Sequence, residues 1–116
     1  MPGARWDAVS WFDGSYLWLF GGLGYDSNGD ASFLNDLWKF DGSNWTWISG
    51  SNTVGQYGTY GTEGSSATGN VPGARWGAVS WINSSGNLWL FGGWGYDSIG
   101  TTGTNYYLND LWVYQP

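Results

Sequence analysis

Cysteine and histidine are both absent from the 116-residue chain. Without cysteine, the protein has no disulfide, no thiol nucleophile and no cysteine-type zinc site. Without histidine, it lacks the commonest general base and the commonest ligand of transition metals, and a Ser-His-Asp triad is excluded. We therefore expect no cofactor, no metal ion and no catalytic residue, since an enzyme would have to work with Asp or Glu alone.

Basic residues are scarce, with 3 Lys and Arg against 9 Asp and Glu, so the net charge is −6. Binding to nucleic-acid phosphates and electrostatic binding to a membrane surface both need a basic patch, and neither is expected. No apolar run approaches the roughly eighteen residues of a membrane-spanning helix, and the N-terminus lacks the apolar region of a signal peptide. The polar, lysine-poor composition favours an extracellular or cell-surface location but leaves the compartment open.

Glycine and aromatic residues are abundant instead: the chain has 21 Gly, 11 Trp, 8 Tyr and 5 Phe. A chain of this length forms one small domain at most. Disordered segments lack bulky apolar residues, and helical bundles need Ala, Leu, Glu and Lys, so both classes fit poorly. We expect an all-β protein with no helix longer than one or two turns.

Several blocks of sequence occur twice in the same order. The three longest are Pro-Gly-Ala-Arg-Trp, Leu-Trp-Leu-Phe-Gly-Gly and Leu-Asn-Asp-Leu-Trp, at residues 2–6 and 72–76, 17–22 and 88–93, and 34–38 and 108–112. Insertions fall between the blocks, as expected if the blocks are strands and the gaps are loops. The chain therefore contains two copies of one structural unit.

The repeated blocks have the composition of short strands, because they mix β-branched and aromatic residues and are bounded by Asp-Gly or Gly-Gly. The pattern predicts seven strands in two sheets, near residues 5–12, 16–20, 34–40, 44–49, 75–82, 87–91 and 107–114. The fourth strand of the first unit has no counterpart in the second unit.

Three segments follow from this organisation. Residues 1–50 form the first unit, residues 72–116 form the second, incomplete unit, and residues 51–71 link the two. The link is rich in Gly, Ser and Thr, yet a structureless stretch of this length is unusual inside a compact domain. We expect an ordered excursion that its own Tyr and Val side chains hold in place.

The sequence resembles the kelch repeat family, in particular the long, Trp-rich bacterial form. The marks of the resemblance are Phe-Gly-Gly at 20–22 and 91–93, Asn-Asp-Leu-Trp followed by an aromatic residue, Phe40 or Tyr114, and Trp47 in the first unit. The resemblance covers nearly the whole chain. It implies a fragment of a β-propeller with two antiparallel blades, the first strand of each innermost around a channel, and the second blade without its outermost strand.

The paired glycines Gly21, Gly22, Gly92 and Gly93 are interpreted as structural. Glycine suits a bulge or a close approach of two backbones, because it has no Cβ and adopts positive φ freely. A phosphate-binding loop would need a helix to begin after the glycines, and none is expected.

Arg5 and Arg75 stand at the starts of the innermost strands, near the expected channel mouth. One interpretation is a contact with an anion or a carboxylate ligand. The favoured interpretation is a structural ion pair with Asp36 and Asp110, because these aspartates recur in step with the arginines.

The candidate ligand-binding residues are Trp94, Tyr25 and Tyr96. Trp94 replaces Leu23 in a segment expected to be a loop, where an indole is able to stack on a sugar or a partner side chain. Most other tryptophans are expected to pack between the two blades.

Two further patterns are weaker. Asp26, Asn28 and Asp30 have the spacing that opens a calcium loop, but the closing bidentate Glu is absent, so no metal site is predicted. Asn44 and Asn83 begin acceptor sequences for N-glycosylation.

The sequence favours a non-enzymatic structural or interaction module. Two blades leave two large aromatic faces uncovered, so we expect copies of the chain to associate head to tail. A ring of three or four copies would contain six or eight blades, and an open filament is the second expectation. The alternatives are a lectin-like module that binds carbohydrate, an enzyme that uses Asp or Glu alone, and a piece of a longer extracellular kelch protein, natural or engineered.

Overall fold

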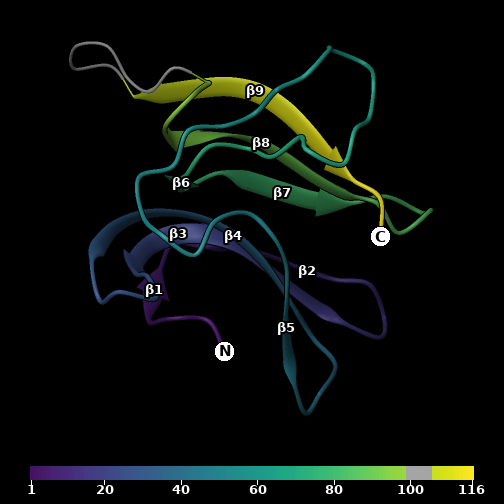
Figure 1. The fold of residues 1–116 in the computed structure, drawn as a ribbon. Helices are drawn as coiled ribbons and strands as arrows, with labels where there is room; N and C mark the ends of the chain where they lie inside the picture. Colours follow the sequence, from purple (N-terminus) through teal and green to yellow (C-terminus); the bar gives the residue numbers. More distant parts are fainter. Residues whose placement is uncertain (99–105) are drawn as a thin grey trace.

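The computed structural model describes residues 1–98 and 106–116, which form nine strands in two antiparallel sheets and contain no helix (Figure 1). The N-terminal sheet consists of β1 (Arg5–Trp6), β2 (Val9–Phe12), β3 (Leu17–Tyr25), β4 (Ala31–Phe40) and β5 (Trp45–Ser49). The C-terminal sheet consists of β6 (Arg75–Trp76), β7 (Val79–Ile82), β8 (Leu88–Gly95) and β9 (Tyr107–Tyr114). The expected all-β fold is confirmed, and this part of the chain holds no helix that could cross a membrane.

Both sheets are antiparallel meanders. In the N-terminal sheet, β1 and β2 lie end to end along one edge of β3, while β4 pairs with the other edge and β5 pairs with β4. In the C-terminal sheet, β6 and β7 pair with one edge of β8 and β9 pairs with the other. The two sheets therefore share one arrangement, as the repeated sequence predicts.

The first strand of each sheet is interrupted, which the sequence did not reveal. Continuous strands were expected at 5–12 and 75–82, whereas the structure breaks them at Asp7 and at Gly77. Both residues have a left-handed backbone conformation, with φ of 56° and 72°, and no residue of 7–8 or 77–78 pairs with the neighbouring strand. The seven expected strands therefore become nine among the described residues.

The paired glycines lie inside strands rather than at their ends. β3 runs on through Gly21 and Gly22, and β8 runs on through Gly92 and Gly93, so the expected ends at 20 and 91 were too early. The pairing with the next strand shifts register at both places, which forms a β-bulge in each sheet. All four glycines have φ between 65° and 100°, so the expectation of positive φ is confirmed.

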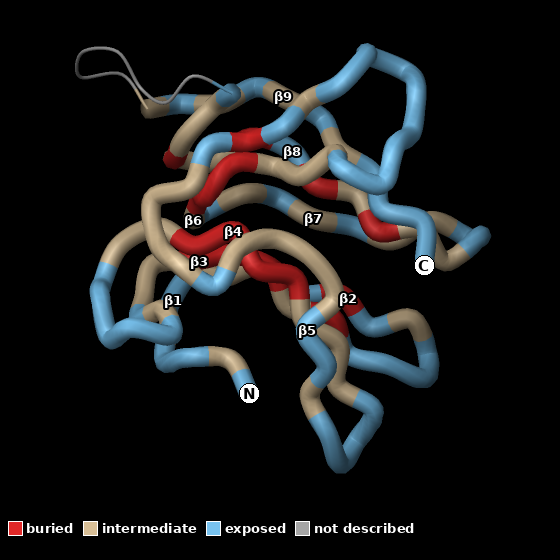
Figure 2. The backbone as a smooth tube through the Cα atoms, viewed as in Figure 1, coloured by how far each residue is buried: buried red, intermediate tan, exposed pale blue. Residues whose placement is uncertain are grey.

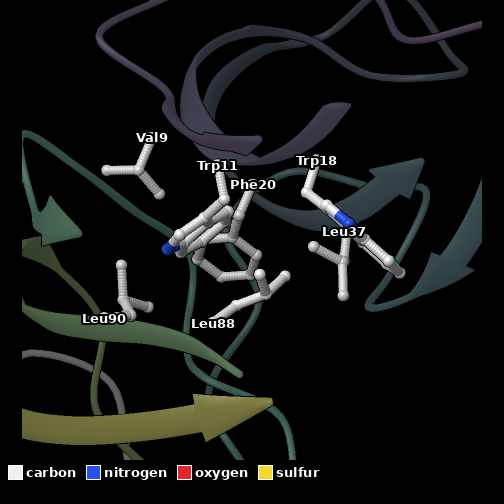
Figure 3. Close-up of a cluster of buried hydrophobic side chains, with 7 residues drawn as sticks. All are labelled: Val9, Trp11, Trp18, Phe20, Leu37, Leu88 and Leu90. Atoms are coloured by element: carbon white, nitrogen blue, oxygen red, sulfur yellow. The ribbon is translucent and has the colours of Figure 1, made fainter. Parts of the chain in front are cut away.

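The core lies between the two sheets, where the buried positions of both sheets face one another (Figure 2). The buried apolar cluster consists of Val9, Trp11, Trp18, Phe20, Leu37, Leu88 and Leu90. In Figure 3, Trp11 and Phe20 of the N-terminal sheet point toward Leu88 and Leu90 of the C-terminal sheet. The Trp11 indole Nε1 also donates a hydrogen bond to the Trp89 carbonyl oxygen, at 3.0 Å.

The segment between the sheets runs from the end of β5 to the start of β6 (Figure 1). It contains no strand, only an isolated bridge between Thr59 and Val71. The Gly55 N–H donates to the Phe33 carbonyl in β4, at 2.9 Å, and the Ala74 N–H donates to the Gln56 carbonyl, also at 2.9 Å. These bonds tie the segment to the N-terminal sheet and to the strand that follows it.

Candidate interaction surface

Each sheet contains one arginine that bridges its first strand to its fourth. The Arg5 guanidinium in β1 binds both carboxylate oxygens of Asp36 in β4, at 2.6 and 2.9 Å. Arg75 in β6 binds Asp110 in β9 in the same way, at 2.6 and 2.8 Å. The pairs are largely buried, with side-chain exposures of 6% and 8% in the first and 1% and 15% in the second.

Each arginine also stabilises the bulge that it crosses. Arg5 donates to the Gly21 carbonyl at 3.1 Å, and Arg75 donates to the Gly92 carbonyl at 3.0 Å. Because the guanidinium groups are buried and bonded to carboxylate and carbonyl oxygens, they are not placed to bind an outside anion. The contacts therefore match the structural ion pairs favoured from the sequence.

Asp110 is the centre of a larger polar cluster. It accepts hydrogen bonds from the Tyr60 hydroxyl and from the Trp112 indole as well as from Arg75. Burial acts to raise the pKa of Asp110, but the hydrogen bonds and charge of Arg75 outweigh it, so the pKa lies below its usual value. Burial and the neighbouring Asp110 carboxylate raise the pKa of Tyr60 to about 12.

Trp94 lies in β8 rather than in a loop, which corrects the expectation from the sequence. Its ring stacks on Trp76 with centroids 5.5 Å apart and also contacts Tyr106 and Tyr107, at 6.0 and 5.4 Å. Trp76 in turn contacts Trp6, at 5.2 Å. The Trp94 ring is therefore one member of a row of packed aromatic rings that joins the two sheets.

Tyr25 and Tyr96 do not join Trp94 in one site. Tyr25 is 53% exposed at the end of β3. Tyr96 packs against Phe33 and Tyr57, with ring centroids 5.5 and 5.8 Å apart. No ring contact among the described residues links Tyr25, Tyr96 and Trp94 to one another.

The remaining sequence candidates act locally. The Asp26 carboxylate accepts hydrogen bonds from the N–H groups of Asn28, Asp30 and Val54, so it holds its own loop to the segment between the sheets.

The two glycosylation candidates and Trp47 lie apart from these groups. Asn44 is exposed in the turn before β5. The Asn83 side-chain oxygen accepts hydrogen bonds from two backbone N–H groups of the turn between β7 and β8. Trp47 in β5 is 49% exposed, and its indole donates to the Ser49 carbonyl.

An apolar surface covers the side of the C-terminal sheet that faces away from the core. We name it the C-terminal face, and its residues are Val79, Trp81, Trp89, Phe91, Leu111 and Val113. Cross-strand pairing of β7 with β8 and of β8 with β9 places all six on one side of the sheet. Val79, Leu111 and Trp81 are 57%, 55% and 45% exposed.

The outer side of the N-terminal sheet is apolar as well. We name it the N-terminal face, and its residues are Phe12, Leu17, Leu19 and Trp38. Phe12 pairs with Leu17, and Leu19 pairs with Trp38, across neighbouring strands. Phe12 is 64% exposed and Leu17 is 38% exposed.

The sequence repeat relates these two outer faces to the buried interface. The repeat counterparts of five C-terminal face residues are Val9, Trp11, Trp18, Phe20 and Leu37, all in the core. The counterparts of the N-terminal face are Ile82, Leu88, Leu90 and Trp112, which pack against those core residues. The molecule thus contains one buried sheet-to-sheet interface, and each outer face consists largely of repeat counterparts of one side of that interface.

Polar groups follow the same pattern. The Asn35 amide donates to the Pro72 carbonyl in the segment that links the sheets, at 3.2 Å, whereas its counterpart Asn109 is exposed. The Trp11 indole is bonded across the buried interface between the sheets, and its counterpart is Trp81. Within the described part of the chain, neither the Asn109 side chain nor the Trp81 indole makes a hydrogen bond.

Sequence reasoning predicted uncovered aromatic faces but did not identify their residues. The signal that identifies them is period-two alternation along β7, β8 and β9, combined with the repeat offset. No protein-family model matches this chain, and none of the curated proteins matches it either.

Proposed function

We propose that the protein is a non-enzymatic interaction module, a kelch-type propeller unit of two blades that associates head to tail with copies of itself. In this assembly the C-terminal face of one copy packs on the N-terminal face of the next. The observation that carries the proposal is the equivalence of these faces to the two sides of the buried interface. The repeat counterparts of the residues that join the sheets within one chain are thus available between chains.

The free energy of association must come from many residues of each face rather than from one side chain. A large apolar side chain contributes roughly 1.5–3 kcal/mol when it is fully buried, and association costs about 4–15 kcal/mol in lost freedom and ordering. The face residues are already partly covered, so each contributes only a fraction of its full value. Several of them must therefore be buried together, and one charge within a face should prevent association.

The contact joins two different faces, so every copy offers one of each and the contact repeats. Such an arrangement closes into a ring when the rotation per copy fits, and otherwise extends as a filament. Three or four copies would supply six or eight blades, within the known range of propellers. A ring of three or four copies is our leading expectation.

The test uses one charged variant on each face. Light scattering should give the wild type a mass of three or four times 12.7 kDa. Leu111→Glu and Leu17→Glu should each be monomeric, because every contact then lacks one intact face. An equimolar mixture of the two variants should form a 1:1 dimer, since one intact face of each kind remains.

Tyr25→Glu is the matched control, because Tyr25 is 53% exposed and lies on neither face. It should assemble like the wild type. A wild-type monomer of 12.7 kDa with a cooperative melt, or a mixture that stays monomeric, would overturn the proposal.

A further inference from the structure

A surface hollow of about 330 Å³ lies between the end of the N-terminal sheet and the segment that links the sheets. We name it the linker hollow, and its volume is at the lower end of the range for ligand pockets. One side is formed by Ser49, Gly50 and Ser51, which end and follow β5, and the other by residues of the linking segment.

The walls of the linker hollow are held by hydrogen bonds within the chain. Thr59 and Val71 exchange two backbone hydrogen bonds, at 2.8 and 2.9 Å. Asn35, which is 2% exposed, accepts the Ser51 N–H and donates to the Pro72 carbonyl. The hollow is therefore formed before any ligand arrives, which reduces the ordering cost of binding.

The lining is uncharged and rich in hydroxyl groups. No Asp, Glu, Lys or Arg contributes to it. Ser49, Tyr57, Thr59 and Thr68 line the hollow, and their hydroxyls make no hydrogen bond within the residues that the structure describes. A hydroxyl group donates one hydrogen bond and accepts others, so these four groups are available to an incoming ligand.

Tyr57 adds an aromatic surface to these polar groups. Its ring is 56% exposed and is supported from one side by Tyr96. The nearby Gln56 amide nitrogen donates to the Thr53 hydroxyl and the Val54 carbonyl, which leaves its side-chain oxygen as an acceptor.

We propose that the linker hollow binds an uncharged sugar. A sugar ring presents hydroxyl groups that exchange hydrogen bonds with hydroxyls and amides, and a C–H face that packs on an aromatic ring. An anionic ligand would find no cation in the lining and a chain of net charge −6. An apolar ligand would leave the hydroxyls buried without partners, which is unfavourable.

All lining residues belong to one chain, so this site does not depend on the proposed assembly. The result of a sugar titration and the mass from light scattering are separate measurements. Failure of one proposal is therefore distinguishable from failure of the other.

The experiment is calorimetric titration of the full chain with glucose, galactose, mannose and N-acetylglucosamine. The methyl glycoside of each sugar is included, because it represents a residue within a glycan rather than a free sugar. Glucuronate is the charged counterpart of glucose. We expect saturable binding of at least one neutral sugar or its glycoside, and at least tenfold weaker binding of glucuronate when glucose is the ligand.

Two variants locate the binding. Tyr57→Ala removes the ring, and Thr59→Val removes a hydroxyl while it keeps the branched side chain and the backbone pairing with Val71. Both should weaken binding at least tenfold, and circular dichroism should remain that of the wild type. Tyr25→Ala, which removes a tyrosine of similar exposure away from the hollow, should bind like the wild type. No saturable binding of any neutral probe, or binding unchanged in Tyr57→Ala and Thr59→Val, would overturn the proposal.

Discussion

Gly21 occupies a position that combines two demands. Its φ is +65°, a conformation that residues with a Cβ rarely adopt. A Cβ at this position would also lie 2.8 Å from the Arg75 carbonyl oxygen and 3.0 Å from the Leu34 carbonyl oxygen. The first contact belongs to the C-terminal sheet, so the missing side chain lets the two sheets approach.

Gly21→Ala should therefore destabilise the protein more than the same substitution at a glycine that has a positive φ but no close backbone neighbour. Gly14 is the matched control, because its φ is +96° and a Cβ there would meet no atom within 4 Å. We expect Gly14→Ala to lower the free energy of unfolding by about 1–2 kcal/mol for the left-handed backbone. Gly21→Ala should cost more because of its backbone contacts. Urea unfolding measures both variants, and equal costs would show that the close approach contributes nothing.

At the scale of elements, each arginine–aspartate pair joins the first strand of a sheet to a later strand that does not pair with it. Arg5 lies in β1 and Asp36 in β4, with β3 between them. The side chains thus cross the β-bulge, where the register shift weakens the backbone ladder. The side-chain hydrogen bonds between Arg5 and Asp36 thus hold β1 to β4 at the bulge, where the backbone pairing of β3 with β4 is irregular.

Asp36→Asn should strongly destabilise the N-terminal sheet, because it leaves the buried Arg5 guanidinium without a counter-charge. Breaking one side of such a pair costs roughly 3–5 kcal/mol. Asp30→Asn is the control, since Asp30 is exposed in the turn before β4 and should change the free energy of unfolding by less than about 0.5 kcal/mol. Denaturant titration, monitored by tryptophan fluorescence, compares the free energies of unfolding of the two variants. A loss below about 1 kcal/mol for Asp36→Asn would contradict the role assigned to the pair.

At the scale of the whole molecule, two sheets bury one interface and leave an apolar face on each outer side. The faces differ in sequence, so self-association by them is directional rather than two-fold symmetric. If the native state is an assembly, its stability includes the contacts between copies and depends on the concentration of the chain.

We therefore expect the melting temperature of the wild type to rise with protein concentration. The Leu111→Glu variant should melt at a temperature independent of concentration, because it lacks an intact C-terminal face. Differential scanning calorimetry over a hundredfold range of concentration makes the comparison. A wild-type melting temperature that stays constant over this range would contradict the proposed association of copies in the native state.

The sequence by itself determined the all-β class, the two equivalent sheets and the need for glycine at the bulges. These features follow from local composition and from the repeat, which are visible without knowledge of contacts. The pairing of Arg5 with Asp36 was also predictable, because both residues recur in step.

Only the tertiary structure decided the features that depend on distant segments. The breaks at Asp7 and Gly77 coincide with left-handed backbone conformations that the composition of the strands does not signal. Trp94 lies in a strand because β8 continues past its bulge and pairs with β6 and β9. The linker hollow exists because residues 50–71 fold back over the end of the N-terminal sheet, which depends on contacts between segments rather than on either segment alone.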